Sequence, residues 1–158
     1  MELMNMAAVR DAAVAGTRKF APDDISEVVK IGNNSLTEYY TETLLLDLFE
    51  AWPNSFMVYT VNGRIVGFIV GSKFSKTEAR ILLLAVDAKF RRMGIGRALM
   101  NGFVEVCNHE NLLSARLEVR TDNDQAIGFY KKLGFSTISV IRSYYSDASD
   151  AYLMWKLL

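Results

Sequence analysis

The chain has 158 residues, of which 51% are hydrophobic and 23% are charged, a composition typical of an ordinary globular protein. Lysine plus arginine equals aspartate plus glutamate, at 18 each, so no global basic field favours nucleic acid and any anion site must be local. One cysteine and one histidine exclude an internal disulfide and argue against a Cys- or His-based metal centre. No apolar run reaches the roughly 20 residues of a membrane span, and the first residues lack a signal-peptide pattern. We therefore expect a cytoplasmic, metal-free protein with no membrane or nucleic-acid partner, forming one domain over 1–158 with an N-terminal extension at 1–13.

The first half of the chain carries signals for two helices and a hairpin. Pro22, followed by two aspartates, marks a helix start, and the run 32–34 (GNN) marks its end. Thr41 is placed to cap a second helix. Asn62-Gly63 between two β-rich runs is the strongest short hairpin signal. The elements predicted here are a strand at 16–20, helices at 24–31 and 41–52, and strands at 55–61 and 64–72.

The second half alternates strands and helices. ARILLLAV (79–86) is a continuous apolar run, which predicts a strand buried on both faces. A turn rich in arginine and glycine follows, and Leu133-Gly134 marks the end of a later helix. The further predicted elements are a helix at 95–109, a strand at 115–120, a helix at 123–132 and an antiparallel pair at 135–145 and 151–158. This order contains a central βαβ crossover, so the sheet is mixed and the class is α/β or α+β.

The turn RRMGIGR (91–97) sits between the apolar strand and the helix behind it. Glycines let the backbone approach an anion, and the helix N-terminus with its arginines favours negative charge. The spacing differs from a Walker loop, and Leu99 stands where a dinucleotide fingerprint needs a third small residue. The turn therefore indicates a local phosphate site. The alternative is an ordinary turn with two solvated arginines.

The run LEVRTDNDQAIGFYKKLGF (117–135) offers titratable groups. By the period of two, Glu118 and Arg120 lie on one face of a strand, opposite Leu117. A carboxylate on a central strand is costly unless it is hydrogen-bonded or functional. Tyr130 falls within the following helix. The alternatives are that Glu118 pairs with a nearby arginine and that Tyr130 packs in the core with its hydroxyl at the rim.

Together, a strand ending LAV, the turn RRxGIGxxL and the run LEVRxxNxxAIxFYxKxGF resemble the GNAT superfamily of acetyl-CoA-dependent N-acetyltransferases, over residues 16–158. SLTEYY (35–40) is similar to the L-P-E-x-Y stretch of N-terminal α-acetyltransferases, and YYSDASDAYLM (144–154) to their YYxDGEDAYLM tail. That family includes bacterial ribosomal-protein alanine N-acetyltransferases, and this chain looks like an archaeal member. The implied fold is a mixed, mostly antiparallel sheet of about seven strands with a central βαβ unit and flanking helices.

The resemblance implies an acetyl-CoA site assembled from several segments, and no metal. Strand backbone groups of Leu84, Ala85 and Val86 would receive the pantetheine arm and thioester. Asn123 would contact the pantetheine. The pyrophosphate would be held, mainly through N–H groups, by the turn of Arg91, Arg92, Met93, Gly94, Ile95, Gly96 and Arg97, while Tyr130, Lys131 and Lys132 would border the thiol end.

The resemblance also implies a reaction and an acceptor. Glu118 matches the general base, acting directly or through water, and Tyr130 the general acid. The groove for the substrate's first residues would be lined by Glu38, Tyr40, Tyr144 and Tyr145. The implied reaction is direct ternary-complex transfer of an acetyl group to the α-amine of a protein N-terminus. A ribosome-associated partner is one expectation for the assembly, and a monomer or weak dimer is the other.

Two positions depart from the family pattern, and two other readings stay open. Thr37 replaces the proline of L-P-E-x-Y, and Arg80 stands where some archaeal relatives carry a histidine. Position 80 therefore supplies no proton transfer. His109 is expected at the surface, and Cys107 is expected to pack as a small apolar residue. The competing readings are a GNAT enzyme that acetylates lysine side chains or small amines, and a non-catalytic acyl-CoA-binding module.

Overall fold

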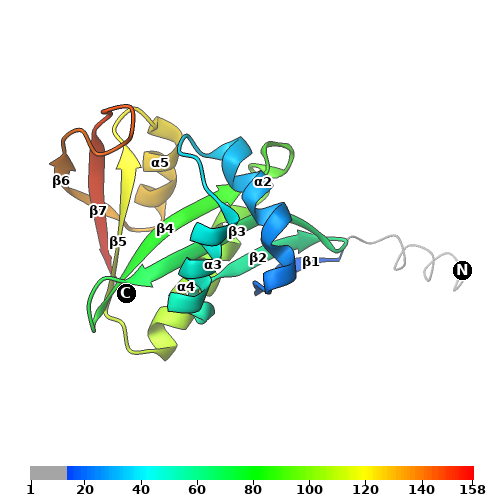
Figure 1. Ribbon diagram of the computed structural model, residues 1–158. Coiled ribbons are helices and arrows are strands. Elements are labelled where there is room, and N and C mark those ends of the chain that lie inside the picture. The colour runs from blue at the N-terminus through cyan, green and yellow to red at the C-terminus, as the bar shows by residue number, and fades with distance from the viewer. Residues whose placement is uncertain (1–13) are drawn as a thin grey trace, which may run out of the picture.

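The computed structural model describes residues 14–158, so the predicted extension at 1–13 lies outside the described part. Seven strands form one sheet (Figure 1). They are β1 (Ala15–Lys19), β2 (Met57–Val61), β3 (Arg64–Lys73), β4 (Glu78–Val86), β5 (Ser114–Arg120), β6 (Ser136–Ile141) and β7 (Ala151–Leu157). The helices are α2 (Ile25–Ser35), α3 (Glu42–Ala51), α4 (Ile95–His109) and α5 (Asp124–Lys132), with 3-10 turns η1 (Pro22–Asp24), η2 (Pro53–Ser55) and η3 (Ala88–Phe90).

The sheet is mixed and mostly antiparallel. Its strand order is β1-β2-β3-β4-β5-β7-β6, and each neighbouring pair is antiparallel except β4 with β5. These two parallel strands are joined by the crossover through α4, as such a connection requires. The predicted fold class, with its central βαβ unit, is confirmed.

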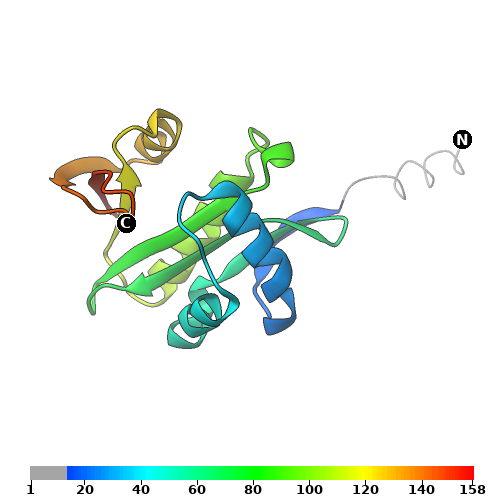
Figure 2. The same ribbon diagram turned by 45° about the horizontal axis from the view of Figure 1, so that its top comes forward.

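The two central strands separate soon after they begin. Their parallel ladder has three pairs, Glu78 with Ser114, Ala79 with Ala115 and Arg80 with Arg116. Beyond these pairs β4 continues to Val86, and Figures 1 and 2 show that it diverges from β5. The backbone edge of β4 that faces β5 therefore has no ladder partner after Arg80. An edge of this kind holds hydrogen-bonding groups that need another acceptor or donor.

The apolar run of β4 is buried on both faces because a bulge reverses its side-chain alternation. The register with β3 shifts at Leu82, since Val70 pairs with Leu83 while Gly71 pairs with Ile81. Ile81 consequently packs in the core under α4, and Leu83 packs in the core under α2 and α3. The predicted strand with two buried faces is confirmed.

Helices cover both faces of the sheet, as Figure 2 shows from a second side. One core contains Val28 and Ile31 of α2, together with Leu45 of α3. The other contains Leu99 and Phe103 of α4. The helices on both faces present an apolar stripe to the sheet, which explains why these amphipathic segments fold as helices.

Several local predictions are confirmed at atomic detail. The Thr41 hydroxyl accepts a hydrogen bond from the Leu44 N–H at 3.1 Å and so caps α3. Asn62 and Gly63 both adopt positive φ, 51° and 81°, as a type I′ hairpin turn requires. Gly134, with φ of 96°, follows the end of α5.

Two predicted boundaries are wrong. The first long helix does not stop at residues 32–34 but continues to Ser35, where Leu36 N–H still reaches the Gly32 carbonyl at 2.8 Å. Asn33 does not end the helix because its amide binds the next loop instead, in two bonds to the Tyr40 backbone. The strand expected at 135–145 ends at Ile141, since Ser143 turns to a φ of 50°.

Candidate active site

A groove of about 590 Å³ opens where two loops meet the central strands. One is the α2–α3 loop (36–41), and the other is the β6–β7 loop (142–150). Both loops are far from the central strands in sequence, so tertiary structure brings them together. The groove's lining includes Glu38, Tyr40, Arg80, Glu118, Tyr144 and Tyr145.

Glu118 lies on the groove face of β5. Its neighbours Leu117 and Val119 point into the opposite core, so the alternation predicted from sequence is confirmed. The Glu118 side chain is 11% exposed, and its Oε2 accepts a hydrogen bond from Arg80 Nε at 3.0 Å. A second guanidinium nitrogen of Arg80 donates to the Tyr144 hydroxyl at 2.6 Å. The arginine partner that was the alternative reading of Glu118 therefore exists, and it lies in the same groove.

Glu38 ties the two loops together. Its Oε1 accepts hydrogen bonds from the Ser146 N–H at 3.0 Å and from the Ser146 hydroxyl at 2.9 Å. These bonds, the backbone one first, lower the pKa of Glu38. The carboxylate of Glu38 is therefore charged at neutral pH and engaged as an acceptor across the mouth of the groove.

Arg120, the last residue of β5, contacts both loops. Its Nε donates to the Thr37 hydroxyl at 2.8 Å, and its Nη1 donates to Asp147 Oδ2 at 2.9 Å. Its guanidinium carbon lies 4.3 Å from the centre of the Tyr145 ring. Thr37, the departure from the family proline, supplies a hydroxyl that proline lacks. It gives the α2–α3 loop an additional bond to the sheet.

Three of the four tyrosines that line the groove are hydrogen-bonding groups rather than anions at neutral pH. Burial, and then the charge of Glu38, raise the pKa of Tyr40. Burial, and then Glu118, raise the pKa of Tyr144. Burial, and then the neighbouring Tyr144, raise the pKa of Tyr145 to about 12. These side chains therefore form a neutral aromatic wall with hydroxyls available to a polar ligand.

Tyr130 lies on α5 and does not line the groove. Its ring packs edge-on against Phe129 and Phe135, with ring centres 5.2 Å and 5.8 Å away. Burial, and then Tyr145, raise the pKa of Tyr130. Core packing, the alternative interpretation of Tyr130, therefore accounts for the position of its ring. Its hydroxyl stays protonated over the neutral range.

The turn before α4 has the features of an anion site. Arg92 and Gly94 adopt positive φ, 62° and 80°, and no side chain caps the helix at Gly94. The first N–H groups of a helix have no intrahelical acceptor, so they point outward here. Gly96 has a different role, because a Cβ there would lie 3.3 Å from Phe129 of α5. Arg91 partly folds back, donating from Nε to the Val86 carbonyl at 3.2 Å.

The other predicted cofactor residues lie on β4 and at the two ends of α5. Leu84 through Val86 lie on the part of β4 without a β5 partner. Asn123 caps α5, its Oδ1 accepting from the Ala126 N–H at 3.1 Å. Lys131 and Lys132 are exposed on the last turn of α5.

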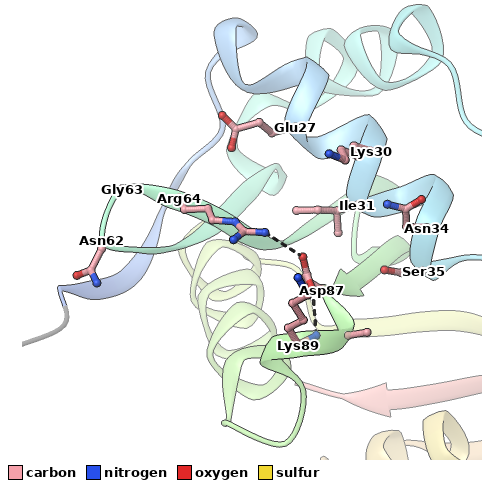
Figure 3. Close-up of a pocket in the computed structure, with 11 residues that line it drawn as sticks. Glu27, Lys30, Ile31, Asn34, Ser35, Asn62, Gly63, Arg64, Asp87 and Lys89 are labelled. Carbon is pink, nitrogen blue, oxygen red and sulfur yellow. Dashed lines mark hydrogen bonds and ion pairs between the residues drawn. The ribbon is translucent and has the colours of Figure 1, made fainter.

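Another pocket, of about 830 Å³, lies elsewhere (Figure 3). It is bounded by α2, by the hairpin turn at Asn62-Gly63 and by the segment that follows β4. Arg64 and Asp87 face one another across it at 3.7 Å, and Asp87 also accepts from the Lys89 N–H at 2.9 Å. No predicted site residue lines this pocket. The smaller groove, where the titratable groups converge, is therefore the candidate active site.

Comparison with known proteins assigns the chain to a family. The acetyltransferase (GNAT) family matches residues 25–135. The chain belongs to this family. As a member of the GNAT family, it resembles an N-alpha-acetyltransferase of Sulfurisphaera tokodaii, with 36% identity over 146 residues that cover 83% of this chain and 86% of that protein.

Two solved structures of acetyltransferases are similar to this GNAT protein over nearly all its length. Ard1 from Thermoplasma volcanium is 60% identical with a TM-score of 0.89, covering 91% of this chain and 97% of that one. Chaetomium thermophilum Naa20, in complex with a bisubstrate analogue, is 31% identical with a TM-score of 0.82, covering 90% and 86%.

Sequence reasoning missed several contributors to this GNAT site. Ser146, Asp147 and Arg120 join the loops, and Arg80 holds Glu118. The strand period places Arg120 on the same face as Glu118, and this pattern could have identified Arg120 as a site residue. No sequence pattern could have identified the contacts between the loops. Within residues 14–158, no cluster of three potential metal ligands occurs, and no helix is both long and apolar enough to cross a bilayer.

Proposed function

We propose that this GNAT protein transfers the acetyl group of acetyl-CoA to the α-amino group of protein N-termini. The observation that carries the proposal is the convergence of Glu118, Glu38 and the groove tyrosines beside the diverging β4 and β5 strands. Acetyl-CoA supplies the acetyl thioester. The protein supplies an anion site at one end of the open strand edge and a polar groove at the other.

Glu118 is the proposed general base, acting directly or through one water. An α-amine has a pKa of roughly 8, so a useful fraction is already neutral near pH 7, and the base has only to accept a proton as the C–N bond forms. Arg80 holds one carboxylate oxygen at 3.0 Å, which leaves the other oxygen for the amine or the water. The ion pair therefore orients Glu118.

Tyr130 is the proposed proton donor to the departing thiolate. Because burial raises its pKa, its hydroxyl carries a proton throughout the neutral range, as a donor needs. Tyr130 lies outside the groove lining, so the thiol end of the cosubstrate would have to pass through the gap between β4 and β5 to reach it.

The cosubstrate is proposed to lie along β4. Leu84, Ala85 and Val86 lie on the part of β4 that has no β5 partner, and this edge would receive the pantetheine arm, with a strand N–H near Val86 as the donor for the developing oxyanion. The N–H groups from Arg92 to Arg97 bind the pyrophosphate at the helix N-terminus. Asn123 and the pair Lys131-Lys132 border the opposite side. Holding amine and thioester together supplies much of the rate.

The acceptor distinguishes the leading function from its alternatives. Glu38 and Tyr40 flank the groove on one side, with Tyr144 and Tyr145 on the other. This double flank suits a chain terminus and obstructs a lysine approached from the middle of a chain. Peptides with free and blocked N-termini, each containing an internal lysine, test the assignment. Equal labelling of both would contradict it, and acetyl-CoA binding without turnover on any peptide or amine would indicate a binding module.

The same proposal includes a kinetic mechanism, a cellular location and a partner. Direct transfer in a ternary complex gives intersecting initial-rate plots, whereas parallel lines would indicate an acetylated enzyme. A cytoplasmic location and a ribosome-associated partner remain predictions. Fractionation of native cells, with ribosomes sedimented at low and high salt, tests both.

A further inference from the structure

The two substrate loops are each fixed separately before they meet. In the β6–β7 loop, Tyr144 and Tyr145 both donate from their backbone N–H groups to the Ser149 carbonyl, at 2.9 and 3.1 Å. The α2–α3 loop is held by the preceding helix, because the Asn33 amide of α2 bonds the Tyr40 backbone twice, at 2.9 and 2.7 Å. Each tyrosine set therefore moves with its own loop, and the width of the groove depends on what joins the loops.

Glu38 joins the two loops directly through Ser146 at the mouth of the groove, and Arg120 contacts both loops from the end of β5. Arg120 bonds Thr37 on one side and Asp147 on the other, and its guanidinium lies over Tyr145. Its side chain is 13% exposed, so it lies beneath the groove rather than in it. The hydrogen bond from Ser149, and then the one from Arg120, lower the pKa of Asp147 to about 2, so this pair stays charged at every physiological pH.

We propose that Arg120 is a positioning residue that sets the spacing between the two loops and thereby the affinity for the peptide N-terminus. This inference rests on the proposed function, because it takes the groove as the peptide site. A guanidinium suits the task, since its rigid fork of donors can serve two acceptors in different directions. Thr37 is part of the same device: its hydroxyl is the acceptor on the α2–α3 side.

The experiment compares Thr37→Val, which removes the hydroxyl at nearly constant shape, with Thr37→Ser, which keeps it. Loss of a hydrogen bond to a charged donor predicts that Thr37→Val raises the peptide KM about tenfold. Thr37→Ser should keep the peptide KM within about twofold of wild type. For both variants, kcat at saturating peptide and the KM for acetyl-CoA should change less than about twofold.

Arg120→Lys extends the test, because an ammonium group cannot hold both loops. The peptide KM of Arg120→Lys should rise by at least about tenfold. The double variant Arg120→Lys/Thr37→Val should show no further rise, because the guanidinium that Thr37 binds is already absent. Thermal unfolding of each variant, followed with and without acetyl-CoA, reports on folding and cosubstrate binding separately.

Three results would overturn the inference. Identical peptide KM values for Thr37→Val, Thr37→Ser and wild type would show that the hydroxyl contributes nothing. A parallel rise in the KM values for peptide and acetyl-CoA, with a lower unfolding temperature, would show a general structural role. If wild type acetylates no free N-terminus, the proposed function fails and this inference fails with it; if wild type is active and the variants are unaltered, only this inference fails.

Discussion

Arg80 Nε donates to Glu118 Oε2 across 3.0 Å, joining the two central strands just where their ladder ends. Arg80 is in the last ladder pair, and Glu118 is the next residue on the same face of β5 after its partner Arg116. The pair spans the start of the gap between the strands, so it holds the proposed base at the inner end of the groove. Arg80 also reaches the β6–β7 loop through the Tyr144 hydroxyl.

Replacing the proposed base should abolish most turnover. Glu118→Gln keeps the shape and loses the proton acceptor, which predicts a fall in kcat of about 10²–10⁴-fold. The matched control is Glu78→Gln, because Glu78 pairs with Arg116 on the same face of the sheet but outside the groove. Steady-state assays should show the loss for Glu118 and near-normal kcat for Glu78. Similar kcat values for the two variants would remove Glu118 from the mechanism.

Removing the guanidinium beside Glu118 should lower turnover. Arg80→Gln takes away the donor that holds Glu118 Oε2 at 3.0 Å, so the proposed base should lose its orientation and kcat should fall by at least about tenfold. Arg80→Lys keeps a positively charged donor and should lower kcat less. Steady-state assays at saturating peptide and acetyl-CoA test this. Equal kcat values in all three proteins would mean that the ion pair has no part in catalysis.

The proton donor should act independently of pH across the neutral range. Tyr130→Phe is expected to lower kcat about 10–100-fold. Because burial raises the Tyr130 pKa, the ratio of wild-type kcat to variant kcat should be equal at about pH 6.5 and pH 9. Tyr152→Phe is the control, since Tyr152 packs against the same core and lies outside the site. A ratio that shrinks at the higher pH would show a hydroxyl that ionises in that range. Unchanged kcat would exclude the role.

Glycine at the α4 turn should matter for the cosubstrate. Gly94→Ala forces a Cβ into a φ of 80°, where no neighbouring atom interferes, so its cost of about 1–2 kcal/mol is backbone strain. The KM for acetyl-CoA should rise while that for peptide stays constant. Gly128 lies inside α5, and a Cβ added there also meets no neighbouring atom. Gly128→Ala should therefore stabilise the protein by about 0.5–1 kcal/mol. Equal effects on both KM values would argue against a phosphate turn.

Asp24 should make stability depend on acid pH. Hydrogen bonds from Arg18 first, and from the Ala21 N–H, lower its pKa despite burial. A lowered pKa in the folded state contributes stability that is present above the unfolded value of about 3.9 and is lost as pH falls through the folded value. Asp24→Asn should therefore cost about 1 kcal/mol at pH 7 and progressively less below about pH 4. Asp23→Asn, an exposed neighbour, is the control. Urea denaturation at pH 7 and below about pH 4 measures the free energy of unfolding of each protein. If Asp24→Asn were still less stable than wild type by the same amount at the acid pH, this prediction would be contradicted.

Local signals predicted elements where the decisive contacts are local. The Asn62-Gly63 turn and the Thr41 cap involve neighbours in sequence, and both are confirmed. The end of α2 was predicted wrongly because Asn33 bonds to Tyr40, seven residues on, in place of ending the helix. The face of Glu118 followed from strand period alone. Its partner Arg80 did not, because their meeting depends on the register between two strands 38 residues apart.

The residue pattern alone indicated the family, by the resemblance of its motifs. It also predicted the mixed sheet and the glycine turn before α4, because these follow from side-chain periodicity and short local signals. The placement of the acceptor groove depended on folding: Glu38 and Ser146 are 108 residues apart, and Arg120 reaches Thr37 across 83. Contacts at such separations are set by how strands pair and where β4 leaves β5. The motif RRMGIGR therefore indicates where acetyl-CoA is expected, while the position of the proposed peptide site follows from loops that meet only in the folded chain.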